Sequence, residues 1–304
     1  MADTYGDQVH LLLGVLPDIA NEAVFALKGG TAINLFYRDM PRLSVDIDLT
    51  YLPVDDREAS LADINRRFGR VMAAVTQRNP RVQSQRIAGG GNNDSRIMVT
   101  EGRTRIKIET SPVMRGAIYP PTMMTASDAV IEQYGFAEMN VLAFEDLYGG
   151  KLHAALDRQH PRDLFDVKLL YENEGLSDDL FRVFMVYVAG SKRPMHELLA
   201  PATPFDEALY NDEFVGMTRE AVTKEELLET GNRLHTDIRT RLTGDIAAFL
   251  LSLHDGAPDF DRIGLPQAAN LPAVRWKLMN LEQLKHKNPD KHAAQREKLE
   301  SLLI

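Results

Sequence analysis

Two short stretches near the N-terminus constrain this chain more than any other part of it. An apolar run ends in the double glycine Gly29-Gly30, and a helical pattern then begins at Thr31. The next apolar run carries Asp46 and Asp48 at alternate positions, so on a strand both carboxylates project from one face. Neighbouring carboxylates repel each other unless a cation lies between them, and a divalent metal is the usual cation. Because glycine permits close backbone approach and a helix start favours phosphate, the two stretches predict a site for a nucleoside triphosphate and magnesium.

Each stretch also has an ordinary explanation. Asp46 and Asp48 could be solvated side chains of an edge strand, although aspartate is disfavoured within strands and here lies among valine, isoleucine and leucine. Gly29-Gly30-Thr31 could be a strand-to-helix turn with a threonine cap, which many folds contain. The order of the two stretches favours the metal and phosphate interpretation of both.

The composition limits the classes of protein that fit. The 304 residues are 44% hydrophobic and 26% charged, which suits a globular chain of two domains. The net charge of -9 argues against sequence-independent nucleic-acid binding, which depends on excess lysine and arginine. The lack of cysteine excludes disulfides, thiol catalysis and zinc–thiolate sites. We find no secretory signal and no apolar run long enough to span a bilayer, so we expect a cytoplasmic protein with no membrane partner.

The hydrophobic pattern predicts an α/β (α+β) core domain with a mixed sheet at residues 1–190 and an all-helical domain at residues 191–304. The proline-containing stretch 190–204 is the expected boundary. Strands are expected at residues 23–27, 44–51, 82–87, 96–100, 104–110 and 140–143, with turns at 89–94 and 101–103. Helices are expected at residues 1–20, 31–37, 58–77, 144–156, 162–172, 178–189, 225–254, 273–286 and 291–303.

The motifs resemble those of a known family up to about residue 170. Gly29-Gly30-Thr31 followed by Asp46-Ile47-Asp48 resembles the signature of polymerase-beta-like nucleotidyltransferases. The longer runs resemble specifically the AbiEii toxin branch: residues 28–35, residues 42–49, and a second block formed by residues 150–156, Arg158 and residues 161–167. The order and combination of these runs make the resemblance more specific than any single run.

This resemblance implies a polymerase-beta-like core that transfers a nucleotide from an NTP to an acceptor hydroxyl and releases pyrophosphate. Mg²⁺ or Mn²⁺ would be the cofactor and the NTP the co-substrate. AbiEii-type proteins are toxins of toxin–antitoxin or phage-defence (abortive infection) pairs, so a cognate antitoxin is an expected partner. Family members can modify the 3′ end of tRNA, which makes tRNA the acceptor that the resemblance implies.

The assignment of roles extends beyond the first two stretches. Catalytic roles are expected for Asp46, Asp48, Glu109, Lys151 and Asp166; nucleotide binding for Gly29, Gly30, Thr31, Lys151, Arg162 and Asp163; and metal binding for Asp46, Asp48 and Glu109. The family resemblance favours Lys151 as a charge on the triphosphate, with Asp166 as its partner, and Asp163 as a residue that orients Arg158 or Arg162.

Several of these residues keep an ordinary alternative. Glu109 lies on one face of a predicted strand with Arg105 and Lys107, so it could be a third carboxylate of the site or their cross-strand partner. Asp166 could be that third carboxylate instead. Lys151 follows Gly149-Gly150, which leave room for a close neighbour, but most lysines lie on the surface.

Two other functions remain open. An acidic protein suits a cationic small molecule such as an aminoglycoside better than it suits RNA, so the acceptor could be a small hydroxylated compound. The chain could also be a non-catalytic module that binds a nucleotide or a partner. The helices expected at 273–286 and 291–303 are locally basic, which fits either an RNA landing site or an ordinary charged helix surface.

Overall fold

The computed structural model describes residues 2–87, 96–201, 205 and 207–303. The chain divides into two compact units, Met1–Ala143 and Phe144–Ile304. The division lies well before the boundary expected near residue 190, because helix α5 (Phe144–Arg158) packs against α7 (Asp178–Ala189) inside the second unit. The turn expected at 89–94 lies outside the described residues.

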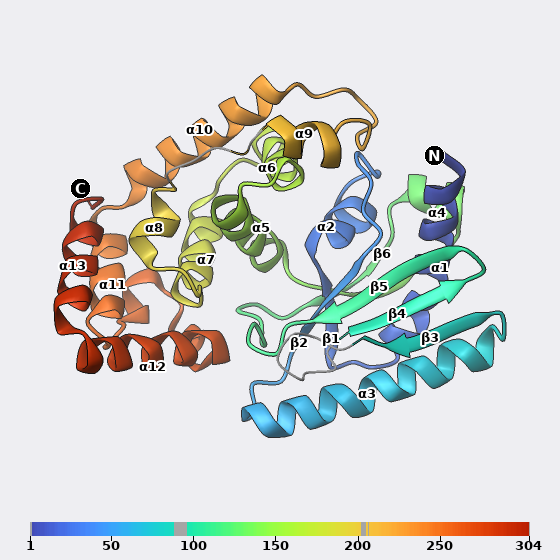
Figure 1. Cartoon of the computed structure of the whole chain (residues 1–304), viewed down its shortest axis with the longest axis horizontal. Helices are drawn as coiled ribbons and strands as arrows, with labels where there is room; N and C mark the ends of the chain where they lie inside the picture. Colours follow the sequence, from blue (N-terminus) through green and yellow to red (C-terminus); the bar gives the residue numbers. More distant parts are fainter. Residues whose placement is uncertain (1, 88–95, 202–204, 206, 304) are drawn as a thin grey trace. The chain divides into compact units, whose positions relative to one another are not determined.

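The first unit is built on a seven-stranded mixed sheet in the order β3-β4-β5-β2-β1-β7-β6 (Figure 1). Its strands are β1 (Phe25–Lys28), β2 (Ile47–Tyr51), β3 (Val82–Arg86), β4 (Arg96–Glu101), β5 (Thr104–Thr110), β6 (Thr122–Thr125) and β7 (Glu138–Val141). The pairs β2–β5 and β1–β7 are parallel, and the other neighbours are antiparallel. This mixed sheet confirms the predicted α/β (α+β) fold class.

Helices α1 (Ala2–Ala20) and α3 (Arg57–Arg78) contact each other and the sheet. Phe25 of β1 packs on Phe68 of α3 with ring centroids 5.4 Å apart. Leu27 and Leu49, which pair across β1 and β2, are 0% exposed and lie on the same side as Phe25. Because side chains alternate along a strand, Asp48 projects from the opposite face of the sheet, away from this core.

Three further helical segments complete the first unit. The short helix α2 (Gly29–Ala32) continues directly into a π-helical turn, η1 (Ile33–Tyr37), where the sequence predicts one helix. Helix α4 (Asp128–Tyr134) and strand β6 were not predicted. Strand β6 is an edge strand with three of its four residues exposed, so its sequence lacks the alternation that a half-buried strand requires.

A buried carboxylate joins the loop after α1 to helix α3. Glu22 is 7% exposed and accepts hydrogen bonds from Arg67 Nη1 at 2.8 Å and Arg70 Nε at 2.7 Å. Burial alone would raise the pKa of Glu22, but the two guanidinium groups outweigh it and hold this pKa below its ordinary value. Ionised Glu22 and its two arginines therefore stabilise the fold at neutral pH.

We expect Glu22→Gln to lower the free energy of unfolding at pH 7 by about 2 kcal/mol, because a charged acceptor of two arginines is lost. The lowered pKa means that this contribution is fully present above pH 4.5, the ordinary value, and disappears as the pH falls through the lower folded-state value. Urea unfolding of both proteins between about pH 7 and pH 3 measures the difference. If the difference in the free energy of unfolding between the two proteins does not become smaller in acid, this role of Glu22 is contradicted.

The second unit is all-helical among its described residues (Figure 1). Its elements are α5, α6 (Pro161–Asn173), α7, α8 (Met195–Leu199), α9 (Glu207–Glu213), α10 (Lys224–Arg241), α11 (Gly244–His254), η2 (Phe260–Ile263), η3 (Pro266–Asn270), α12 (Pro272–Lys287) and α13 (Pro289–Glu300). The single helix expected at 225–254 is two helices, because Leu242 leaves the helical conformation and Gly244 has a φ of 54°. None of the helices in the described part of the chain is both long and apolar enough to cross a membrane.

Candidate active site

The two aspartates lie at the start of β2. Asp46 directly precedes the strand and its side chain is 53% exposed, whereas Asp48 is the second residue of the strand. Between and after them, Ile47 and Leu49 are 0% exposed in the core. The predicted alternation therefore holds, although the strand begins at Ile47 rather than at residue 44.

Strand register places a row of charged residues across one face of the sheet. Lys28 of β1 pairs with Asp48, Asp48 pairs with Glu109 of β5, and Glu109 pairs with Arg96 of β4. Paired residues on neighbouring strands project from the same face. Glu109 is therefore the direct neighbour of Asp48, and Arg96 Nε lies 3.0 Å from Glu109 Oε2.

The electrostatics of this row reflect burial and crowded negative charge. Burial, together with the nearby charges of Glu109 and Asp46, raises the pKa of Asp48 to about 6 against the opposing effect of Lys28. Burial also lowers the pKa of the Lys28 ammonium. A cluster with these shifts is typical of functional sites, where unfavourable charge is kept for a ligand.

The double glycine lies directly against these side chains. Gly29 has a φ of 75°, and a Cβ atom there would lie 2.7 Å from Asp48 Oδ2. A Cβ atom at Gly30 would collide with the Arg42 guanidinium and lie 2.8 Å from Ser44 Oγ. A larger residue at either position would therefore have to displace a side chain of this site, and Gly29 also has a left-handed backbone.

We expect Gly29→Ala to lower the free energy of unfolding by about 2 kcal/mol, through both the left-handed backbone and the contact with Asp48. Gly102→Ala is the matched control, since Gly102 has a φ of 59° with nothing within 4 Å of an added Cβ. Equilibrium denaturation of both variants separates the free-energy cost of the left-handed backbone from that of the contact with Asp48. Equal losses in the two variants would show that Asp48 does not press on residue 29.

Thr31 has a structural environment that the sequence did not indicate. It is 0% exposed, and its hydroxyl donates to the Asp46 backbone oxygen at 2.5 Å and lies 3.1 Å from Ser44 Oγ. Asn34, one helical turn later, accepts a hydrogen bond from the Arg42 backbone N–H at 3.2 Å. The helix after the glycines thus positions the segment that leads into the aspartates.

A third cation lies among the carboxylates. Lys107 Nζ is 3.5 Å from Asp46 Oδ2 and 3.3 Å from Glu109 Oε2. Burial opposes its charge, but Asp46 and Glu109 outweigh burial and raise the pKa of Lys107. Across the described ranges, no three carboxylate or histidine side chains already stand in metal-binding geometry. The donor chemistry of Asp46, Asp48 and Glu109, three hard oxygen ligands on one face, nevertheless fits a divalent ion.

The second sequence block forms a buried ionic cluster in the second unit. Lys151 Nζ of α5 lies 2.8 Å from Asp163 Oδ1 and 2.9 Å from Asp166 Oδ2 of α6. Lys151 is 6% exposed and both aspartates are 0% exposed, which excludes the surface-lysine explanation. Burial would raise the pKa of Asp163, but Lys151 and Arg158 outweigh it and hold this pKa far below its ordinary value.

The structure shows which side chains adjoin this cluster. Arg158 Nη2 donates to Asp163 Oδ1 at 2.9 Å, so Asp163 orients Arg158. Arg162 lies instead beside Glu213, at 3.6 Å. The room left by the glycines before Lys151 is filled by Tyr187 of α7, whose ring would lie 3.1 Å from a Cβ atom at Gly149.

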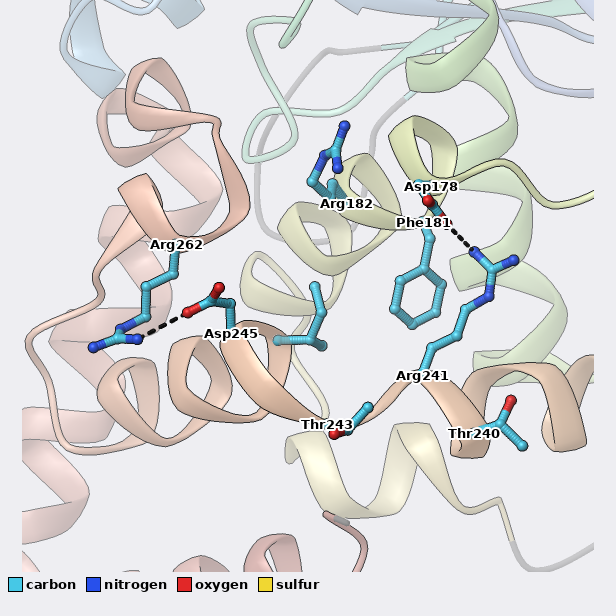
Figure 2. Close-up of a pocket in the computed structure, with 9 residues that line it drawn as sticks. Asp178, Phe181, Arg182, Thr240, Arg241, Thr243, Asp245 and Arg262 are labelled. Atoms are coloured by element: carbon cyan, nitrogen blue, oxygen red, sulfur yellow. Dashed lines mark hydrogen bonds and ion pairs between the residues drawn. The ribbon is translucent and has the colours of Figure 1, made fainter.

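A pocket of about 400 Å³ lies in the second unit (Figure 2), and its lining does not include Lys151, Asp163 or Asp166. Its lining residues come from α7, α10, α11 and η2, and include Arg182, Arg241 and Arg262. Arg241 pairs with Asp178 at 3.1 Å and Arg262 with Asp245 at 2.9 Å, as the dashed lines in Figure 2 mark. Arg182 pairs with Asp179. Because its arginines are already paired with carboxylates, we assign the pocket no role.

A mixed sheet with a glycine bend beside clustered carboxylates is an arrangement that fits an enzyme handling a nucleoside triphosphate. The sequence profile described as "Nucleotidyl transferase AbiEii toxin, Type IV TA system" matches residues 10–280. The chain therefore belongs to the AbiEii family of nucleotidyltransferase toxins, which act within type IV toxin–antitoxin systems.

A solved structure shows the same fold. The chain is similar to "MenT4, nucleotidyltransferase toxin Rv2826c from Mycobacterium tuberculosis H37Rv", with a TM-score of 0.56 and 16% sequence identity, over 91% of this chain and 93% of that chain. A search of curated proteins found no match. The resemblance and the enzyme class expected from the sequence motifs are thus confirmed.

Proposed function

We propose that Asp46, Asp48 and Glu109 hold a divalent metal, Mg²⁺ or Mn²⁺, for transfer of a nucleotide from an NTP to an acceptor hydroxyl. The observation that carries this proposal is the strand register, which sets Glu109 directly beside Asp48 on one face of the sheet. The raised pKa of Asp48, to about 6, supports it, since a divalent cation relieves this crowding of negative charge.

Glu109 rather than Asp166 is our candidate for the third carboxylate. Asp166 is fully buried and bound by Lys151 within the second unit. The side chain of Glu109 is 28% exposed and lies on the face that carries Asp46 and Asp48. We therefore propose that Glu109 either accepts the proton of the acceptor hydroxyl or holds a second metal.

The residues of the first unit suggest how the reaction would proceed. When bound, the metal would supply Lewis-acid stabilisation of the triphosphate and of the attacking oxygen. Backbone N–H groups at Gly29 and Gly30 would face the β- and γ-phosphates. The acceptor oxygen would attack the α-phosphate in line, the bond from the α-phosphorus to the bridging oxygen would break, and pyrophosphate would leave.

Roles for the second unit are proposals of the same kind. Lys151 and Asp166 form a buried pair in the block that resembles AbiEii proteins, and we propose that both are needed for activity. Arg162 and Asp163 were expected to bind nucleotide. The bonds of Asp163 to Lys151 and Arg158 support a positioning role for Asp163 instead.

We propose the 3′ end of tRNA as the acceptor. This rests on the resemblance to AbiEii-type proteins, together with membership of a toxin family whose target must matter to the cell. An NTP and tRNA meet in the cytoplasm, so that is the proposed place of action, and phage defence is the proposed setting. A small cationic acceptor such as an aminoglycoside is the second candidate, because the net charge of -9 favours a cation over RNA.

The test is incubation of the purified chain with each α-labelled NTP, Mg²⁺ and purified tRNA, followed by a denaturing gel. The proposal is supported if label enters intact tRNA but does not enter tRNA whose 3′-terminal hydroxyls were oxidised before the incubation. A parallel panel of aminoglycosides gives label in a small product if the second candidate is correct. No transfer to either acceptor, together with unchanged growth inhibition by Asp46→Ala, would leave only the non-catalytic module.

A further inference from the structure

The ammonium of Lys107 occupies the space between two of the proposed metal ligands. Its Nζ atom lies 3.5 Å from Asp46 Oδ2 and 3.3 Å from Glu109 Oε2. These two carboxylates come from different segments, since Asp46 directly precedes β2 and Glu109 lies on β5. Lys107 therefore bridges the same pair of segments that a metal held by Asp46 and Glu109 would bridge.

The other cations of this face are held differently. Lys28 is a register partner of Asp48 and its ammonium is buried, with Asp48 and Glu109 as the charges that stabilise it. Arg96 binds Glu109 from β4, on the far side from Asp48. Lys107 shares its strand with Glu109, and its side chain is 32% exposed, on a flexible four-carbon stem. Its ammonium can therefore leave for solvent without disturbing the strand.

We propose that Lys107 is an internal counter-ion that occupies the cation position of the metal-free enzyme and must be displaced when the divalent metal binds. This inference rests on the proposed function of Asp46, Asp48 and Glu109. The observation that carries it is the position of one ammonium within 3.5 Å of both Asp46 and Glu109.

An internal counter-ion at this position has two effects. Lys107 prevents repulsion among the carboxylates when no metal is present, which lets the sheet form with three acids on one face. It also competes with the metal, so the metal-free enzyme binds a divalent ion more weakly than the same carboxylates would without it. The displaced ammonium then becomes available to a phosphate on that face, which is why enzyme activity alone cannot test the idea.

The test measures Mn²⁺ binding to the full chain without nucleotide, by calorimetric titration and by the electron paramagnetic resonance of free Mn²⁺. We expect Lys107→Met to lower the Kd for Mn²⁺ about ten-fold, since the neutral side chain keeps the stem but removes the competing charge. Lys107→Arg keeps the charge and is expected to bind Mn²⁺ no more tightly than the parent protein.

Arg105→Met is the matched control for net charge. Arg105 is exposed on the same strand and the same face, two residues farther from Glu109, and pairs in register with Thr100. We expect the Kd of Arg105→Met for Mn²⁺ to stay within about two-fold of the parent value, because salt screens exposed charges that lie far from the site. A ten-fold gain in Arg105→Met as well would show a general charge effect and overturn the role of Lys107.

The outcomes separate this inference from the proposed function. If Asp48→Asn abolishes Mn²⁺ binding while Lys107→Met matches or weakens the parent affinity, the metal site stands and the counter-ion inference falls. If Asp48→Asn leaves Mn²⁺ binding unchanged, the proposed metal site is wrong, and the inference falls with it. Thermal unfolding of each variant tests whether the fold is retained.

Discussion

Asp48→Asn is expected to slow nucleotidyl transfer at least about a hundred-fold, because the transition state loses a metal ligand worth several kcal/mol. The amide has the shape of the carboxylate but not its charge. The measurement is the initial rate of label transfer from α-labelled NTP at saturating substrate. We expect the loss in kcat to exceed any change in KM, since the metal acts on charge that develops during the reaction.

The same variant should remain folded. Burial raises the pKa of Asp48 from 3.8 to about 6, so its ionised form costs stability increasingly between these values and fully above pH 6. Asp48→Asn at pH 7 removes this charge, so we expect the free energy of unfolding not to fall. Asp39→Asn, an exposed aspartate before β2, is the control and should keep both activity and stability. Full activity of Asp48→Asn would contradict the assignment.

Lys151→Met is expected to lower the free energy of unfolding by about 3 kcal/mol or more. The substitution leaves Asp163 and Asp166, both 0% exposed, without the ammonium that lies 2.8 and 2.9 Å from them. Arg158 still neutralises Asp163, so part of the charge in the cluster remains compensated. Urea denaturation monitored by circular dichroism measures the difference.

Lys168→Met provides the comparison within α6. Lys168 pairs with Glu172 at i,i+4 on the surface, where the Glu172 side chain is 49% exposed. Such a pair contributes about 0.5 kcal/mol or less. A loss in Lys151→Met as small as that in Lys168→Met would mean that the buried cluster does not hold α5 and α6 together.

The parts of the fold that the sequence predicted are those with strong periodicity. Strand β5 has the predicted bounds, because its apolar residues alternate with Arg105, Lys107 and Glu109. Helix α3 was predicted to within one residue at each end from its apolar stripe. The break between α10 and α11 was missed, because one glycine in a helical pattern does not by itself reveal a φ of 54° at Gly244.

The features of the candidate site also divide into those that residue spacing predicts and those that depend on strand register or packing. The shared face of Asp46 and Asp48 follows from spacing alone. The pairing of Asp48 with Lys28 and Glu109 depends on strand register, which the sequence of a single strand does not specify. The fixed position of the Thr31 hydroxyl, and of Tyr187 against Gly149, depends on packing between distant segments. These contacts required the three-dimensional structure.

The most direct test of the whole account is a crystal structure of the chain with Mn²⁺ and a non-hydrolysable NTP analogue, with anomalous scattering used to locate the metal. We predict a manganese peak within coordination distance of carboxylate oxygens of Asp46 and Asp48, with Lys107 turned away from Asp46. A bound nucleotide whose metal lies elsewhere, with Lys107 still between Asp46 and Glu109, would contradict the account.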